Sequence, residues 1–168
     1  MFFAGFALFL NGVSYFVPFN RKTLGIVNLL CAGLMIANTA GGALLNVPVG
    51  ELPTDFYANA AGGCAFALNF LILGIHHLKE LEDFALFGWF SLLMCVVSAT
   101  FLTQACILSF PWIFIYLWAM WAVLWGQAFI ASGLKIKAVD KLSPYFVLGN
   151  AVFSLIVPGI LLLLNILP

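Results

Sequence analysis

Charged residues are what this 168-residue sequence has least of. Only 7% of its residues are Asp, Glu, Lys or Arg, six acidic and six basic, and 65% are hydrophobic. Soluble domains carry about 25% charged residues, and so few charges cannot cover the surface of a soluble fold of this size. The composition therefore predicts a protein that lies in a lipid bilayer. The net charge of zero excludes a polybasic arm for nucleic acid, and no nucleic-acid partner is expected.

Residues that build metal and catalytic sites are also scarce. The four cysteines form no CxxC pair, so we expect neither a zinc site nor a disulfide framework. The two histidines, His76 and His77, are adjacent, and side chains one residue apart on a helix diverge by about 100°. No acidic or basic residue falls within an apolar run, which disfavours proton-coupled transport, ion pumping and intramembrane proteolysis. We expect no enzymatic activity, no cofactor and no metal.

Six long apolar runs make up most of the chain. Lipid offers no partners to backbone N–H and C=O groups, and the runs are too long for barrel strands, so each is predicted to be a helix. The expected fold is an all-α, polytopic bundle of six transmembrane helices, forming one transmembrane domain over residues 1–168. The predicted spans are residues 2–17, 24–46, 56–76, 84–105, 111–134 and 144–167.

The basic residues predict the orientation of this bundle. All six follow the first, third or fifth run: Arg21, Lys22, Lys79, Lys135, Lys137 and Lys141. With six spans these three segments share one side of the membrane. That side is cytoplasmic by the positive-inside rule, which places both termini outside.

The polar residues within the runs are neutral carboxamides: Asn11, Asn28, Asn38, Asn69, Gln127 and Asn150. One interpretation is that they join helices through hydrogen bonds of about 1 kcal/mol each. The other is that they line a path for a polar, uncharged solute. The sequence leaves both interpretations open.

The fifth run carries an aromatic row. At about 100° per residue, four rings fall within about 60° of one another and extend about 16 Å along the helix: Phe114, Trp118, Trp121 and Trp125. An interfacial belt would occupy only the ends of the span, although packing against neighbouring helices is an alternative. If the row faces a pore, its uncharged walls exclude hydrated ions but accept a small planar amide such as urea.

Several stretches carry a resemblance to a known family. They are Leu117–Trp125, Ala128–Ile130 and Leu134–Ile136 near the fifth run, with Asn11-Gly12, Phe56-Tyr57, His76, Trp89–Leu92 and Ser143-Pro144 elsewhere. Together they resemble the AmiS/UreI family of urea and amide channels over nearly the whole chain. The resemblance implies a channel of the bacterial inner membrane through which urea or short aliphatic amides diffuse passively. It also implies six protomers in a ring, each with its own pore.

The resemblance extends to the pore lining. With the aromatic row, it implies ten lining residues: Leu8, Asn11, Ala65, Asn69, Phe114, Trp118, Trp121, Leu124, Trp125 and Asn150. Ala65 and Asn69 stand where the acid-gated member of the family has aromatics, and Asn150 stands where it has a carboxylate. The selectivity slot is therefore expected to be wider or more polar in this chain.

The external loops differ from those of the acid-gated member, which are long and rich in histidine. The segments around Val47–Asp55 and Thr103–Phe110 are short and contain no histidine, the side chain that titrates between pH 5 and 8. Glu51 and Asp55 titrate only under more acidic conditions. We therefore predict a pore without acid gating.

Two other functional classes remain open from the sequence. One is a substrate-binding membrane subunit of a small-molecule importer, which would retain its ligand tightly. Such subunits use small residues on the first helix for docking, and Leu8 stands where a second alanine is wanted. The other is a structural membrane partner, which would leave bilayer permeability unchanged.

Overall fold

The computed structural model describes the backbone of residues 2–45 and 54–167 and the side chains of residues 2–41 and 62–167. Every regular element in these ranges is a helix. The first five long helices are α1 (Phe2–Val13), α2 (Arg21–Leu45), α3 (Thr54–Leu78), α4 (Ala85–Ile107) and α5 (Trp112–Ala128). The π-helical turn η1 (Phe129–Gly133) continues α5, and a short α6 (Lys137–Asp140) follows. The last segment runs through α7 (Ser143–Asn150), the π-helical η2 (Ala151–Ile156) and α8 (Val157–Leu163).

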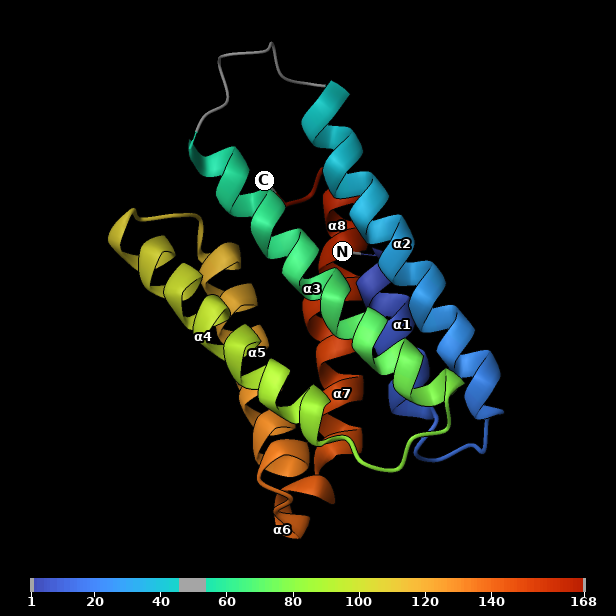
Figure 1. Ribbon diagram of the computed structural model, residues 1–168. Coiled ribbons are helices and arrows are strands. Elements are labelled where there is room, and N and C mark those ends of the chain that lie inside the picture. The colour runs from blue at the N-terminus through green and yellow to red at the C-terminus, as the bar shows by residue number, and fades with distance from the viewer. Residues whose placement is uncertain (1, 46–53, 168) are drawn as a thin grey trace.

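The helices pack as two antiparallel pairs around a central group. α2 lies along α3, and α4 lies along α5 and η1, while α1 contacts α2, α7 and η2 (Figure 1). The α6 turn lies at one end of the bundle, and α8 extends toward the other (Figure 1). α1, α3, α5 and α7 therefore meet in the interior, which is where a site enclosed by the bundle has to lie.

Glycines allow both pairs to approach closely. A Cβ on Gly25 of α2 would lie 2.8 Å from the carbonyl oxygen of Gly74 on α3. A Cβ on Gly88 of α4 would lie 2.1 Å from the backbone nitrogen of Gly133 in η1. Small residues at helix crossings are typical of membrane bundles, where close backbone contact replaces the hydrophobic driving force.

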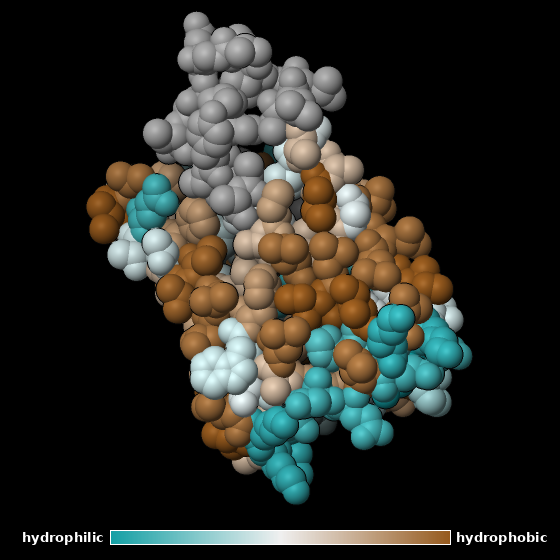
Figure 2. Space-filling view, viewed as in Figure 1, coloured by the Kyte–Doolittle hydropathy of each residue, from teal (hydrophilic) through white to brown (hydrophobic). Residues whose placement is uncertain are grey.

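The outer surface is apolar over most of its height. Figure 2 shows hydrophobic residues over the middle of the molecule and hydrophilic residues gathered at one end. Four helical segments are long and apolar enough to cross a membrane: Arg21–Gly41, Ala85–Ile107, Trp112–Gly133 and Ser143–Leu163. α1 and the Gly62–Leu78 part of α3 are apolar but shorter. The chain is thus an all-helical, multi-pass membrane protein throughout the part that is described.

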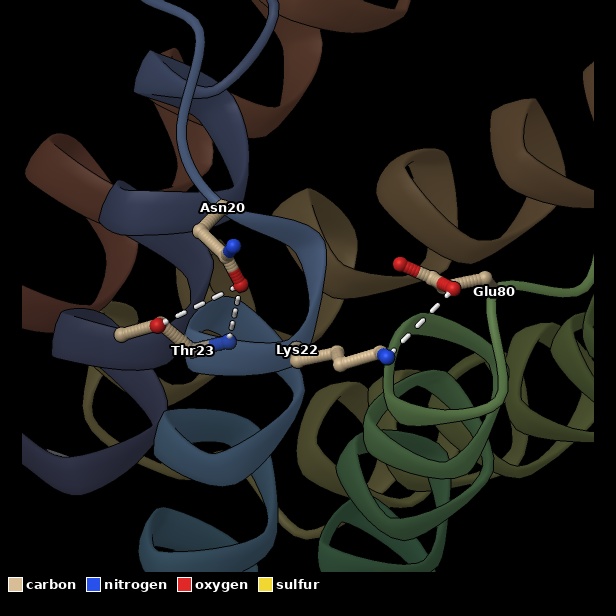
Figure 3. Close-up of polar contacts among 4 residues, drawn as sticks. All are labelled: Asn20, Lys22, Thr23 and Glu80. Atoms are coloured by element: carbon tan, nitrogen blue, oxygen red, sulfur yellow. Dashed lines mark hydrogen bonds and ion pairs between the residues drawn. The ribbon is translucent and has the colours of Figure 1, made fainter.

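The hydrophilic end joins three connecting segments through polar contacts. Lys22 Nζ lies 3.7 Å from a carboxylate oxygen of Glu80 (Figure 3). Nearby, Asn20 Oδ1 accepts a hydrogen bond from the Thr23 N–H at 3.1 Å (Figure 3). Lys135 Nζ lies 3.1 Å from Asp83 Oδ1. We call this end, which carries residues 20–22, 79–83 and 135–141, the basic end.

The first and last helical segments differ from the sequence-based prediction. α1 ends at Val13, whereas the first span was predicted to reach residue 17. The Ser14 hydroxyl donates a hydrogen bond to the Asn11 carbonyl at 2.6 Å. In addition, a residue that precedes a proline, as Val17 precedes Pro18, disfavours the helical conformation. In the last span, Pro158 lacks an N–H, and the helix before it widens so that the Val157 N–H donates to the Val152 carbonyl.

Candidate functional site

A cavity of about 830 Å³ enters the bundle from the basic end. Around its mouth lie charged residues, including Arg21, Asp83, Lys135, Lys137 and Asp140. Further in, its walls are apolar or neutral: Leu8, Asn11, Leu73, Leu124 and Trp125. The cavity therefore leads from a charged vestibule to a lining without an ionisable group among the described residues at that depth.

One of the lining residues, Trp125, belongs to a group of packed aromatic rings. Phe66 of α3 packs edge-on against three indoles of α5, with ring centroids 6.4 Å from Trp118, 4.9 Å from Trp121 and 5.5 Å from Trp125. Phe101 of α4 stacks on Trp118 at 4.5 Å and 18°. We call Phe66, Phe101, Trp118, Trp121 and Trp125 the aromatic cluster.

The deep indoles face the interior of the bundle. Trp121 is 9% exposed and Trp125 is 3% exposed, whereas Trp112 at the start of α5 is 69% exposed. Trp112 is therefore placed like a residue of an interfacial belt, and the two deeper indoles are not. Of these two, Trp125 lines the cavity, and Trp121 packs against Phe66 outside the lining.

Hydrogen bonds fix one indole of the cluster. Trp121 Nε1 donates to the Ser154 hydroxyl at 3.0 Å, and Ser154 in turn donates to the Asn150 carbonyl oxygen at 2.7 Å. Ser154 lies in η2, so the widened π turn presents the hydroxyl to α5. π turns occur frequently at functional sites. Asn150 supports this chain of hydrogen bonds and is 2% exposed, but it does not line the cavity.

A second polar contact joins α1 to α2. Asn11 Nδ2 donates to Asn28 Oδ1 at 2.8 Å, and Asn28 Nδ2 donates back to Asn11 Oδ1 at 2.9 Å. This reciprocal pair is the helix-joining use of membrane carboxamides. Asn11 nevertheless also lines the cavity. The helix-joining interpretation therefore applies to Asn11, and its role in a solute path stays a prediction.

Other buried polar atoms lack a hydrogen-bond partner in the described part of the chain. They are both side-chain atoms of Asn69, Ser98 Oγ, Trp125 Nε1 and His77 Nδ1. Native structures satisfy nearly all buried polar groups, so each exception calls for an explanation. His77 and Trp125 are the two of these residues that also line the cavity.

The remaining predicted residues lie nearby but outside the cavity lining. Ala65 is half-buried against the core, and Phe114 is half-buried beside Phe110, with ring centroids 6.4 Å apart. Trp118 and Trp121 belong to the aromatic cluster but not to the lining. The loop around Val47–Asp55, with Glu51 and Asp55, lies outside the residues whose side chains are described.

Sequence reasoning missed Phe66 and Phe101. The chain contains 18 phenylalanines, and composition does not single out two of them. The available signal for Phe66 was its place next to Ala65 and one turn before Asn69 on the same helix.

Comparisons with known proteins agree with this geometry. A sequence profile of the AmiS/UreI family transporters matches residues 1–166. A Mycolicibacterium smegmatis protein assigned as a transporter of amidate substrates is 23% identical over 162 residues, which cover 96% of this chain and 74% of that protein.

Two solved structures share the fold. The crystal structure of the Helicobacter pylori urea channel matches with a TM-score of 0.77 and 21% identity, over 98% of this chain and 95% of that one. The electron cryomicroscopy structure of the H. pylori urea channel in its closed state matches with a TM-score of 0.77 and 24% identity, over 99% and 97%. These relatives are transporters and channels rather than enzymes. With its profile match over nearly the full length, the chain belongs to the AmiS/UreI family of transporters.

Proposed function

We propose that this protein is a channel through which urea and short aliphatic amides diffuse passively along the aromatic cluster. The observation that carries the proposal is the position of Phe66 among three indoles of α5, of which Trp125 also lines the 830 Å³ cavity. Aromatic faces are apolar and stack on a planar amide, whereas an ion loses its hydration there without a compensating charge. A neutral planar solute is the cargo that fits this chemistry.

The same proposal includes the membrane arrangement. We propose that residues 1–168 form a single domain of six spans, in which the shorter α1 and α3 cross the bilayer along with the four longer segments. The basic end lies in the cytoplasm by the positive-inside rule, which places both termini outside the bacterial inner membrane. By family resemblance the protomers assemble as a hexameric ring, each around its own pore. Native mass spectrometry of the detergent-purified protein tests this stoichiometry.

We further propose that external acid does not gate the channel. His76 is buried at the basic end, where its Nδ1 lies 2.9 Å from the Ile72 carbonyl and its Nε2 lies 3.1 Å from the Asp83 carbonyl. His77 is its neighbour, so both histidines belong to the side assigned to the cytoplasm. The Ala85 N–H and then Lys135 lower the pKa of Asp83 from its usual value, which keeps that carboxylate charged between pH 5 and 8.

Stopped-flow solute uptake into proteoliposomes tests the channel. Urea, formamide and acetamide should enter vesicles containing the wild-type protein faster than protein-free vesicles. Trp125→Ala should change both the rate and the ranking of the solutes, because it removes the indole where the cavity meets the cluster. Trp112→Ala is the matched control, since the exposed Trp112 lies on the same helix away from the site. Tight retention of a radiolabelled solute by detergent-purified protein would instead indicate an importer subunit.

A further inference from the structure

One buried histidine at the basic end joins α3 to the connection that follows it. We call this connection, residues 79–84, the α3–α4 loop. His76 is 4% exposed. Its Nδ1 lies 2.9 Å from the carbonyl oxygen of Ile72, one turn earlier on α3, and its Nε2 lies 3.1 Å from the carbonyl oxygen of Asp83 in the loop.

Both hydrogen-bond partners of the His76 ring are acceptors. A carbonyl oxygen only accepts a hydrogen bond, so each ring nitrogen has to donate one. A neutral imidazole carries a single N–H, whereas an imidazolium carries two. The two contacts therefore form together only when His76 is protonated. In the neutral ring, one nitrogen would turn its lone pair toward a carbonyl oxygen, and that contact would be lost.

The ring of Phe84 packs on the same imidazole. The ring centroids of His76 and Phe84 lie 5.1 Å apart, and their planes are inclined by 28°. The face of an aromatic ring attracts a cation, so this stacking also favours the protonated form of His76. Phe84 and Asp83 line the cavity as well. The part of the loop that His76 binds is therefore part of the cavity mouth.

The loop has a strained backbone and few strong contacts. Glu80 adopts a φ of 54°, in the left-handed region that residues other than glycine rarely occupy. Arg21 donates to the Leu81 carbonyl at 2.8 Å, and Lys22 forms an ion pair with Glu80 (Figure 3). The partners of this ion pair are more than half exposed, and exposed ion pairs stabilise a fold little. We therefore expect the loop to depend most on the buried contact with His76.

The charged groups around the loop do not account for a pH response near neutrality. The Ala85 N–H and then Lys135 lower the pKa of Asp83 from its usual value, so this carboxylate stays charged between pH 5 and 8. Of the side-chain types present here, only histidine ordinarily changes its charge in that range. The other charged residues of the loop and of the start of α2 are Arg21, Lys22, Lys79, Glu80 and Glu82.

His77 is the second histidine beside the loop. Its Nδ1 has no hydrogen-bond partner in the described part of the chain. Its ring contacts Phe84 edge-on, with centroids 5.9 Å apart. A change in the charge of His77 therefore breaks no hydrogen bond between α3 and the loop, whereas a change in the charge of His76 does.

We propose that His76 is a proton-dependent latch of the cavity mouth. The protonated ring binds the loop to α3 through both nitrogens and keeps Phe84 stacked against it. When the pH rises on the side where the basic end lies, His76 loses one N–H, one of the two contacts breaks, and the loop and Phe84 become free to move into the mouth. The latch is thus complete at the acidic end of the range from pH 5 to 8 and is lost as the pH rises. It responds to the side of the basic end, so it is separate from gating by external acid.

Hydrogen–deuterium exchange of the detergent-purified wild-type protein tests the latch without a variant. The Leu81 N–H donates to the His76 carbonyl at 3.0 Å, and the Ala85 N–H donates to Asp83 Oδ1 at 2.9 Å. The protection factors of residues 79–85 should fall by about tenfold between pH 5 and pH 8, the effect of losing one hydrogen bond to a charged group. Those of the middle of α5 should not change. Equal protection of the loop at both pH values would overturn the latch.

Two single substitutions assign the effect to one histidine. A glutamine amide does not titrate, so the loop of His76→Gln should exchange with the same protection factors at pH 5 and pH 8. His77→Gln should keep the wild-type dependence on pH. Circular dichroism and size-exclusion profiles establish that each variant is folded. A folded His76→Gln that keeps the dependence, or a folded His77→Gln that loses it, would overturn the assignment.

Urea uptake into proteoliposomes measures the effect of the latch on the mouth, and this part of the inference rests on the proposed channel function. The pH is kept equal inside and outside, so that the orientation of the protein does not matter. Wild-type urea permeability should fall from pH 5 to pH 8, and that of His76→Gln should not depend on pH. Wild-type permeability equal to that of protein-free vesicles at both pH values would overturn the channel. Wild-type permeability that is high but independent of pH would overturn the role of His76 at the mouth.

Discussion

Removing the Phe66 ring is the sharpest perturbation of the aromatic cluster. Phe66 is 7% exposed and contacts two indoles at 4.9 and 5.5 Å. Each aromatic pair contributes about 0.5–1.5 kcal/mol beyond its buried area, and Phe-to-Ala changes in packed cores cost about 3–5 kcal/mol in total. Phe66→Ala should therefore lower the stability of the detergent-purified protein by several kcal/mol. It should also leave a void between α3 and α5 beside Trp125, which lines the cavity.

That void predicts a loss of size selection rather than a loss of flux. Stopped-flow uptake of formamide, acetamide, propionamide and butyramide should show the largest relative gain for the longest solute. Phe66→Leu, which refills most of the space without a flat ring, should fall between Phe66→Ala and the wild type. If folded Phe66→Ala ranks the four amides as the wild type does, Phe66 does not stand in the permeation path and the account of the cluster is wrong.

Three further predictions concern packing and pH. Asn28→Leu should lower the melting temperature, because it leaves the buried Asn11 carboxamide unpaired. Adding Asn11→Leu should recover part of this loss. If a thermal-shift double-mutant cycle shows that the two changes are simply additive, the Asn11–Asn28 pairing is contradicted. Gly88→Ala should prevent stable assembly of α4 against η1, because the new Cβ would lie 2.1 Å from the Gly133 backbone nitrogen, and a monodisperse variant with the wild-type melting temperature would refute this contact. Urea uptake should proceed at the same initial rate at external pH 7 and pH 5, so activation several-fold at pH 5 would show acid gating.

Much of the helical layout follows from the sequence, because lipid makes one physical rule dominate. Backbone groups without water must pair within a helix, so the length of an apolar run largely sets the length of the element. The predicted end of the first span lay several residues beyond Val13, where α1 ends, because that end depends on the side-chain hydrogen bond of Ser14 and on Pro18. The family assignment, based on the indole spacing of the fifth run and on scattered motifs, is confirmed by the profile match.

The site was less accessible to sequence reasoning. Trp125 and Leu124 both line the cavity from α5. Residues on one face of a single helix can be recognised from their spacing in the sequence. Phe66 reaches the Trp125 ring from α3, and the register between helices depends on contacts such as Gly88 with Gly133. Such contacts leave no periodic pattern. Asn11 was predicted to line the pore. Its hydrogen bonds with Asn28 could not be predicted, because they depend on the rotation of α1 relative to α2.

The central claim is that an uncharged aromatic passage conducts small planar amides and excludes ions. The most direct test measures urea permeability and ionic conductance on the same proteoliposome preparation. The account predicts urea permeability well above that of protein-free vesicles and potassium and chloride conductance equal to theirs. Urea permeability equal to that of protein-free vesicles, or an ionic conductance that rises with the amount of protein, would contradict it.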